Sequence, residues 1–168
     1  MERKREYYLT VGLFIVYLVK LTWSILFKLN WNLLQLDHWR SINFIPFSAS
    51  LAVNGRLEIT EIINNALVFL PFGVYLSMLR PKWSWLQITA VCFCTSLCFE
   101  MLQLILALGA SDITDIITNT SGGILGIALY RCMKKLWKDK TQKIVNGLFC
   151  IATVLLAGFL LILVLANL

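Results

Sequence analysis

Five long apolar runs are the feature that most constrains the fold of this 168-residue chain. A helix needs roughly 20 apolar residues to cross the hydrocarbon core of a bilayer, and the runs lie at about 7–29, 62–79, 86–108, 113–133 and 144–166. The composition is 59% hydrophobic and 14% charged, with a mean hydropathy of +0.77, which excludes an ordinary soluble domain. We therefore predict an all-α polytopic membrane bundle of about five transmembrane helices, forming one domain over residues 1–168.

Lysine and arginine residues indicate how this bundle is oriented. They gather before the first run at 3–5, between the second and third at 80–82, and between the fourth and fifth at 131–143. In a five-helix chain these three flanks fall on one side of the membrane. Because cytoplasmic flanks carry the excess of Lys and Arg, we predict a cytoplasmic N-terminus and an outside C-terminus in the cell membrane.

The net charge of +6 is explained by this topology, and no nucleic-acid-binding motif accompanies it, so we expect no nucleic-acid partner. The basic run at 131–143 could also bind acidic lipid, but the orientation explains it without a binding function. The predicted outer loop at 30–60 is too long for a simple turn. We expect it to lie along the outer interface, with Trp31 and Trp39 at the level of the head groups.

Polar residues occupy one face of the fourth run. Asp112, Asp115 and Asn119 are spaced i, i+3 and i+7, which places them on one side of a helix. Gly122 and Gly126 continue this face as a G-x-x-x-G pair, which allows close helix packing. An ionisable side chain near the bilayer centre costs about 2.5–3.5 kcal/mol on insertion scales, so such residues are usually functional.

Two other runs carry polar residues at a matching depth. Glu100 and Gln103 are spaced i, i+3 near the outer end of the third run, and Asn65 lies just inside the outer end of the second. Asn65 belongs to a stripe with Phe69 and Gly73, beside a proline that should kink the helix. Asn64 could face inward instead of Asn65. The sequence therefore predicts that polar groups from three helices converge beneath the outer head groups.

A purely structural interpretation competes with this one. Asp112 could be a helix N-cap, and Asp115 could favour the positive N-terminus of the same helix. Gln103 and Asn119 could join helices through hydrogen bonds. Glu100 is harder to explain in this way because it has no helix end beside it.

The remaining reactive residues give weaker signals. The five cysteines lack the spacing of a metal site, so we interpret them as small buried hydrophobic residues: Cys92, Cys94, Cys98, Cys132 and Cys150. His38 is the only histidine, and a lone imidazole in a loop is a poor indicator of a metal site. Lys20, in the middle of the first run, can be explained by snorkelling or by an ion pair.

Four motifs in a fixed order resemble the VanZ-like family of membrane proteins over about residues 7–130. They are RSINFIPF at 40–47, NALVFLPFG at 65–73, FEMLQ at 99–103, and GASDITDIITNTSGG at 109–123. Many relatives carry an arginine shortly before the first aspartate of the last motif, where this chain has Gly109 and Ala110. In this respect the chain is most similar to the glycopeptide-resistance members of the family. If that arginine binds phosphate in relatives, Arg40 is the cation that would replace it here.

The resemblance implies a Gram-positive cell-membrane protein that lowers susceptibility to teicoplanin-type glycopeptide antibiotics. It leaves the chemistry open. Our first hypothesis is an outer-leaflet site, enzymatic or not, for the polar head of a membrane lipid or lipid-linked cell-wall intermediate. The catalytic candidates are Glu100 as acid or base, with Asp115 and Asp112. These three carboxylates could also hold a divalent cation.

The substrate-binding candidates come from all four motifs: Asn65, Gln103, Asn119, Arg40 and Asn43. Two alternative functions remain open. A non-enzymatic binder would hide surface or lipid targets from the antibiotic. A proton-coupled transporter or flippase would use Glu100 with Lys20, but the inner half lacks a second acidic relay, and the broken helices and paired halves of such transporters are missing.

Overall fold

The computed structural model describes residues 2–26, 39–47 and 59–166. Its helices and strands, in chain order, are α1 (Glu2–Leu26), β1 (Trp39–Asn43), α3 (Ile59–Leu79), α4 (Trp85–Leu106), β2 (Leu108–Asp112), α5 (Ile113–Trp137), the short 3-10 helix η2 (Lys138–Lys140) and α6 (Thr141–Ala166). The predicted all-α class is confirmed. Each apolar run coincides with a helix, to within a few residues at the described ends.

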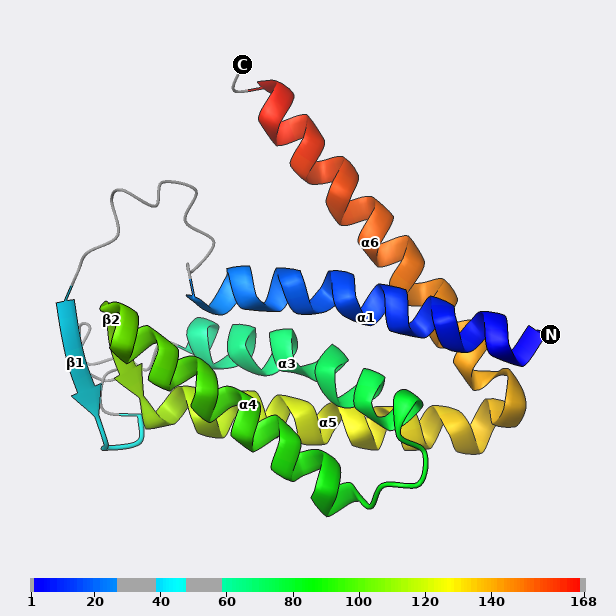
Figure 1. Ribbon diagram of the computed structural model, residues 1–168, viewed down its shortest axis with the longest axis horizontal. Helices are drawn as coiled ribbons and strands as arrows, with labels where there is room; N and C mark the ends of the chain where they lie inside the picture. Colours follow the sequence, from blue (N-terminus) through cyan, green and yellow to red (C-terminus); the bar gives the residue numbers. More distant parts are fainter. Residues whose placement is uncertain (1, 27–38, 48–58, 167–168) are drawn as a thin grey trace.

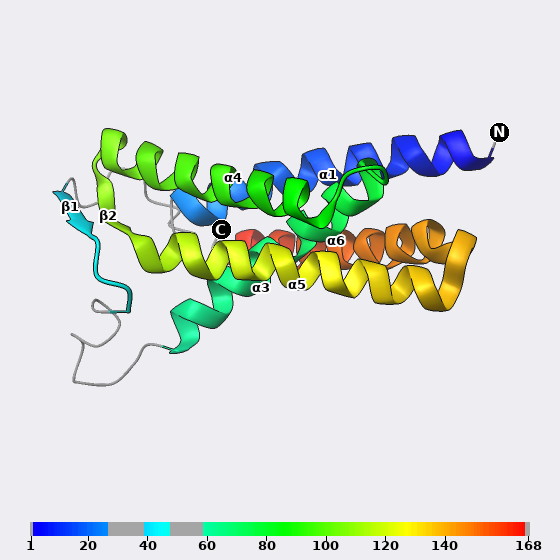
Figure 2. The same cartoon turned by 90° about the horizontal axis from the view of Figure 1, so that it is seen from below.

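The helices reverse direction along the chain and give the bundle two distinct ends. The N-terminus, the α3–α4 connection and the α5–α6 connection lie at one end, and β1 and β2 lie at the other (Figure 1). The three basic flanks predicted from the sequence therefore share an end of the bundle. Figure 2, seen from below, shows α5 running beside α4 along the length of the molecule.

Four helical segments in the described part of the chain are long and apolar enough to cross a membrane: Lys4–Leu26, Ile59–Leu79, Trp85–Leu106 and Ile113–Leu163. The last of these contains both α5 and α6, which double back on each other at η2 (Figure 1). Many large apolar side chains on the outer faces of the helices are exposed. Such a surface suits contact with lipid.

Glycines hold α3 and α5 in close contact, as the sequence predicted for Gly122 and Gly126. A Cβ atom added at Gly122 would collide with the carbonyl oxygen of Ala66, and one at Gly126 with that of Leu70. A Cβ atom at Gly73 would in turn meet the carbonyl oxygen of Gly123. Only glycine permits this backbone approach, which fixes the relative position of the two helices.

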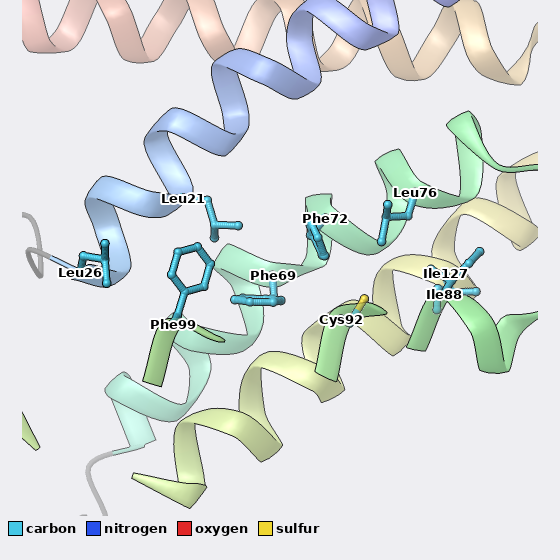
Figure 3. Packing of buried hydrophobic residues seen from close by; sticks show 9 residues of the cluster. All are labelled: Leu21, Leu26, Phe69, Phe72, Leu76, Ile88, Cys92, Phe99 and Ile127. Atoms are coloured by element: carbon cyan, nitrogen blue, oxygen red, sulfur yellow. The ribbon is translucent and has the colours of Figure 1, made fainter. Parts of the chain in front are cut away.

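The hydrophobic core lies between α1, α3, α4 and α5. Nine buried side chains form one cluster, drawn in Figure 3: Leu21, Leu26, Phe69, Phe72, Leu76, Ile88, Cys92, Phe99 and Ile127. Cys92 is buried here as predicted, but the other four cysteines are exposed on the outer faces of their helices, so that prediction was wrong for them. Apolar patterning cannot separate core-facing from lipid-facing positions, because both are apolar.

A parallel pair of short strands closes the end of the bundle opposite the N-terminus, and the sequence did not predict it. β1 pairs with β2 so that Trp39 lies opposite Leu108 and Asn43 opposite Asp112. The turn between α4 and β2 uses Ala107 in the left-handed conformation, with φ 54°. Part of the predicted outer loop therefore lies against the start of α5, whereas Trp31 and His38 fall outside the described residues.

A buried polar network joins the beginning of α6 to the beginning of α1. The Asn146 amide donates to the Glu6 carboxylate at 2.9 Å and to the Glu6 backbone carbonyl at 3.0 Å. Thr10 donates to the Asn146 side-chain oxygen at 3.0 Å. These three residues are buried. Beyond this contact, α6 diverges from α1 (Figure 1).

Candidate functional site

A polar cavity of about 360 Å³ lies at the end of the bundle opposite the N-terminus. Its walls come from the last turns of α1, the first turns of α3 and α5, and the last turns of α4. The lining residues are Ser24, Ile25, Thr60, Glu61, Asn64, Asn65, Val68, Glu100, Gln103, Asp115 and Asn119. The volume is in the range of small-molecule pockets in proteins, which starts at roughly 300 Å³.

Five of the eight residues selected from the sequence line this cavity. They are Asn65, Glu100, Gln103, Asp115 and Asn119. Antiparallel packing of α3 and α4 against α5 brings the polar ends of the three helices together. The predicted convergence of these side chains is therefore observed in the geometry.

Glu100 is the most deeply buried acidic residue of the cavity, with 2% of its surface exposed. Its Oε2 atom accepts hydrogen bonds from the Ser111 hydroxyl and the Asp112 backbone N–H, each at 3.0 Å. Both donors follow the reversal from α4 into β2. These two hydrogen bonds hold the Glu100 side chain against the start of α5. A buried polar side chain needs such partners.

Asp115 links α5 to α3 at the cavity wall. The Asn65 amide donates to its Oδ1 atom at 2.7 Å. The sequence left the choice between Asn64 and Asn65 open, and both residues line the cavity. Asn65 makes the contact with the carboxylate.

Two buried amides also line the cavity, each held through its nitrogen. Gln103 donates to the backbone carbonyl of Ile25 at 2.9 Å, and Asn119 donates to the Ser96 hydroxyl at 3.0 Å. These contacts join helices, as the structural interpretation expected. Their oxygens, Oε1 of Gln103 and Oδ1 of Asn119, are buried and have no hydrogen-bond donor among the described residues. Each of these two lining residues therefore has one buried oxygen that the described part of the chain does not satisfy.

Asp112 has a structural role beside the cavity and does not line it. It is the N-cap of α5: its Oδ1 atom accepts from the Thr114 backbone N–H at 2.8 Å. Its Oδ2 atom accepts from the Asn43 amide at 3.0 Å, across the β1–β2 pair. Arg40 lies in β1 opposite Gly109, but its side chain is outside the described set.

The described carboxylates are not grouped as a metal site would require. Within residues 2–26, 39–47 and 59–166, no group of three or more His, Cys, Asp or Glu side chains could hold a metal ion. The predicted set of Asp112, Asp115 and Glu100 is separated because Asp112 points to the cap and to Asn43. Lys20, invoked for transport, is exposed and is not among the lining residues.

The sequence reasoning missed three polar lining residues, Ser24, Thr60 and Glu61, and named Asn64 as an alternative to Asn65. Glu61 lies immediately before the predicted apolar run at 62–79 and so fell outside the predicted helix. Its spacing of i, i+4 from Asn65 is the signal that could have placed it on the same helical face.

Comparisons with known proteins agree with the motifs found in the sequence. A family model described as VanZ/LLP1 matches residues 14–138. Protein VanZ of Enterococcus faecium is 40% identical over 156 residues, which are 92% of this chain and 91% of that protein. No solved structure matches. The family match spans every residue that lines the cavity.

Proposed function

The chain belongs to the VanZ/LLP1 family of membrane proteins, and from this membership we propose that it lowers the susceptibility of a Gram-positive cell to teicoplanin-type glycopeptides. It does so through an outer-leaflet cavity that binds, or acts on, the polar head of a lipid or lipid-linked cell-wall intermediate. The observation that carries the proposal is the buried Glu100 side chain among the other polar residues that line this cavity.

In this proposal the chain crosses the membrane five times from a cytoplasmic N-terminus, so the cavity opens at the outer face. Two features support this arrangement. The chain turns back at η2, between the end of α5 and the start of α6, so each helix counts as one crossing (Figure 1). The basic flanks share the end of the bundle that is opposite the cavity, and positive flanks favour the cytoplasm (Figure 1). The whole chain then acts as one membrane domain.

Glu100, Asp115 and Asn65 form the wall on which the head group rests. In an enzyme, Glu100 would transfer a proton at the head group. In a binder, the same wall would hold the head group and hide it from the antibiotic. Lipid mass spectrometry of cells with and without the protein separates these mechanisms, because only an enzyme leaves chemically altered lipids or wall precursors.

The test of the proposal is the teicoplanin susceptibility of a sensitive Gram-positive host that expresses the chain. Glu100→Gln and Asp115→Asn keep the side-chain shapes and remove the charges. We expect both variants to lose resistance while their abundance in the membrane fraction is unchanged. Glu2→Gln is the matched control, because Glu2 pairs with Lys143 on the exposed surface at the opposite end. If both cavity variants kept full resistance, the cavity would have no part in it.

A further inference from the structure

The α1 and α6 helices start side by side and then separate. In their first turns Asn146 of α6 donates to the Glu6 carboxylate of α1 at 2.9 Å. Lys143 of α6 forms an ion pair with Glu2 of α1 at 3.1 Å. Beyond these contacts α6 diverges from α1 and runs toward the end of the bundle that holds the cavity (Figure 1). The facing sides of the two helices are therefore apart in that half of the bundle.

The diverging part of α6 is apolar on every side. The ring of Phe149 stacks on Tyr75 of α3, with the centroids 4.5 Å apart. After this contact no residue from 150 to 163 is buried, and large side chains such as Leu155 and Phe159 are 68% and 58% exposed. This stretch contains no charged residue. A helix that is apolar all round and not covered by protein is typical of a membrane span, so lipid chains are its expected neighbours.

Lys20 interrupts the apolar part of α1 on the side that turns toward α6. It follows Glu2 by 18 residues, or about five helical turns, so the two residues share one face of α1. Glu2 contacts α6 through its ion pair with Lys143. Lys20 is exposed and forms no ion pair with another residue of the described part of the chain. It therefore lies on the face of α1 that α6 has left uncovered.

The position of Lys20 along α1 brings its charge close to the membrane interface. Lys20 precedes Leu26, the last residue of α1, by six residues, or roughly 9 Å along the helix axis. A lysine below the interface lays its carbon chain along apolar surface and extends its ammonium group toward the head groups. Ser24, which lines the cavity, follows Lys20 by one turn. The ammonium group therefore reaches the interface beside the cavity.

From these observations we infer that an anionic phospholipid binds between α1 and α6, with its acyl chains against α6 and its phosphate on Lys20. A lysine ammonium group has three N–H donors and binds phosphate as a point charge. An anionic lipid has no cation of its own to compete for that phosphate. The apolar α6 helix of a second copy would cover this face but leave the ammonium group without an anion. The site lies outside the cavity, so the inference goes beyond the proposed function.

Snorkelling alone would also explain an exposed lysine in a membrane span, but it leads to a different result. A snorkelling ammonium group is satisfied by water and by any polar head group, so lipids with the same acyl chains would bind equally well. A phosphate site prefers a lipid with a net negative charge, because the two opposite charges attract each other. The preference also depends on a cation at residue 20.

The test is photolabelling of the purified full-length protein in bilayer nanodiscs, with lipids that carry a diazirine in one acyl chain. Phosphatidylglycerol is anionic, phosphatidylcholine carries its own cation, and diacylglycerol lacks the phosphate. Mass spectrometry of the peptides locates the labelled residues. We expect phosphatidylglycerol to label residues 13–20 and 150–160 about fivefold more than either other lipid, the ratio for one lysine beside anionic lipid. Equal labelling by the three lipids, or no labelling of these segments by any of them, would overturn the inference.

Variants of single lysines locate the preference at the proposed site. Lys20→Gln changes an exposed residue, so it should not disturb folding, and we expect it to abolish the preference for phosphatidylglycerol in both segments. Lys20→Arg keeps the positive charge and should keep the preference. Lys4→Gln is the matched control, because Lys4 is an exposed lysine at the other end of the same helix. An unchanged preference in Lys20→Gln, or an equal loss in Lys4→Gln, would refute the phosphate site at Lys20.

Discussion

The close packing of α3 against α5 predicts a large cost for adding one methyl group at Gly122. The Cβ atom of alanine would collide with the backbone carbonyl of Ala66. Overpacking of a core typically costs about 1–3 kcal/mol. Because the obstacle here is backbone and cannot rotate away, we expect Gly122→Ala to lower the free energy of unfolding by about 3 kcal/mol.

Gly12→Ala is the matched control, since nothing lies within 4 Å of a Cβ atom at Gly12 in α1. This substitution should change the free energy by less than about 1 kcal/mol, in the stabilising direction, because alanine loses less backbone entropy in a helix. The two variants should therefore differ by at least about 100-fold in their unfolding equilibrium constants.

The assay is reversible unfolding of the purified protein in mixed micelles with increasing sodium dodecyl sulfate, followed by circular dichroism. The variants should also differ in resistance, because the glycine contact sets the position of Asn65 relative to Asp115. If Gly122→Ala were as stable as Gly12→Ala, α3 and α5 could not be in backbone contact. The relative position of these two helices, which form part of the cavity wall, would then be wrong.

Three further predictions concern the rest of the bundle. Asn146→Leu removes the donors to Glu6 and leaves a buried carboxylate poorly paired, so it should destabilise the protein by about 2–3 kcal/mol in the same assay; a neutral result would reject the contact between α1 and α6. Lys143→Ala removes only an exposed ion pair with Glu2 and should have no measurable effect on the unfolding midpoint. Ser84→Ala removes the capping box at the start of α4 and should cost about 1 kcal/mol, whereas an equal midpoint would show that the cap is dispensable.

The helices and the polar cavity could be predicted from the sequence because local rules govern them. Apolar length identifies each helix, and spacing along a helix fixes which side chains share a face. Once consecutive helices reverse direction, Asn65, Glu100 and Asp115 must lie at one end of the bundle. Their meeting thus follows from position along the chain and needs no knowledge of detailed packing.

Long-range pairing could not be predicted in this way. β1 and β2 are far apart in the sequence but pair in the structure. Asn43 contacts Asp112 only because the chain reverses after α4. This contact is also why Asp112 caps a helix and does not reach the cavity. The Glu6–Asn146 contact likewise joins segments near the two ends of the sequence. Both residues lie at the edge of an apolar run, where a polar residue is expected and gives no signal.

The most direct test of the central claim asks from which side of the membrane the cavity can be reached. Glu61→Cys and Lys82→Cys are made in a background with all five native cysteines replaced, and intact cells are treated with a membrane-impermeant maleimide. An outer-leaflet cavity predicts labelling of Glu61→Cys in intact cells and of Lys82→Cys only after lysis. Labelling of Lys82→Cys in intact cells, with Glu61→Cys protected until lysis, would place the cavity at the cytoplasmic face and contradict the account.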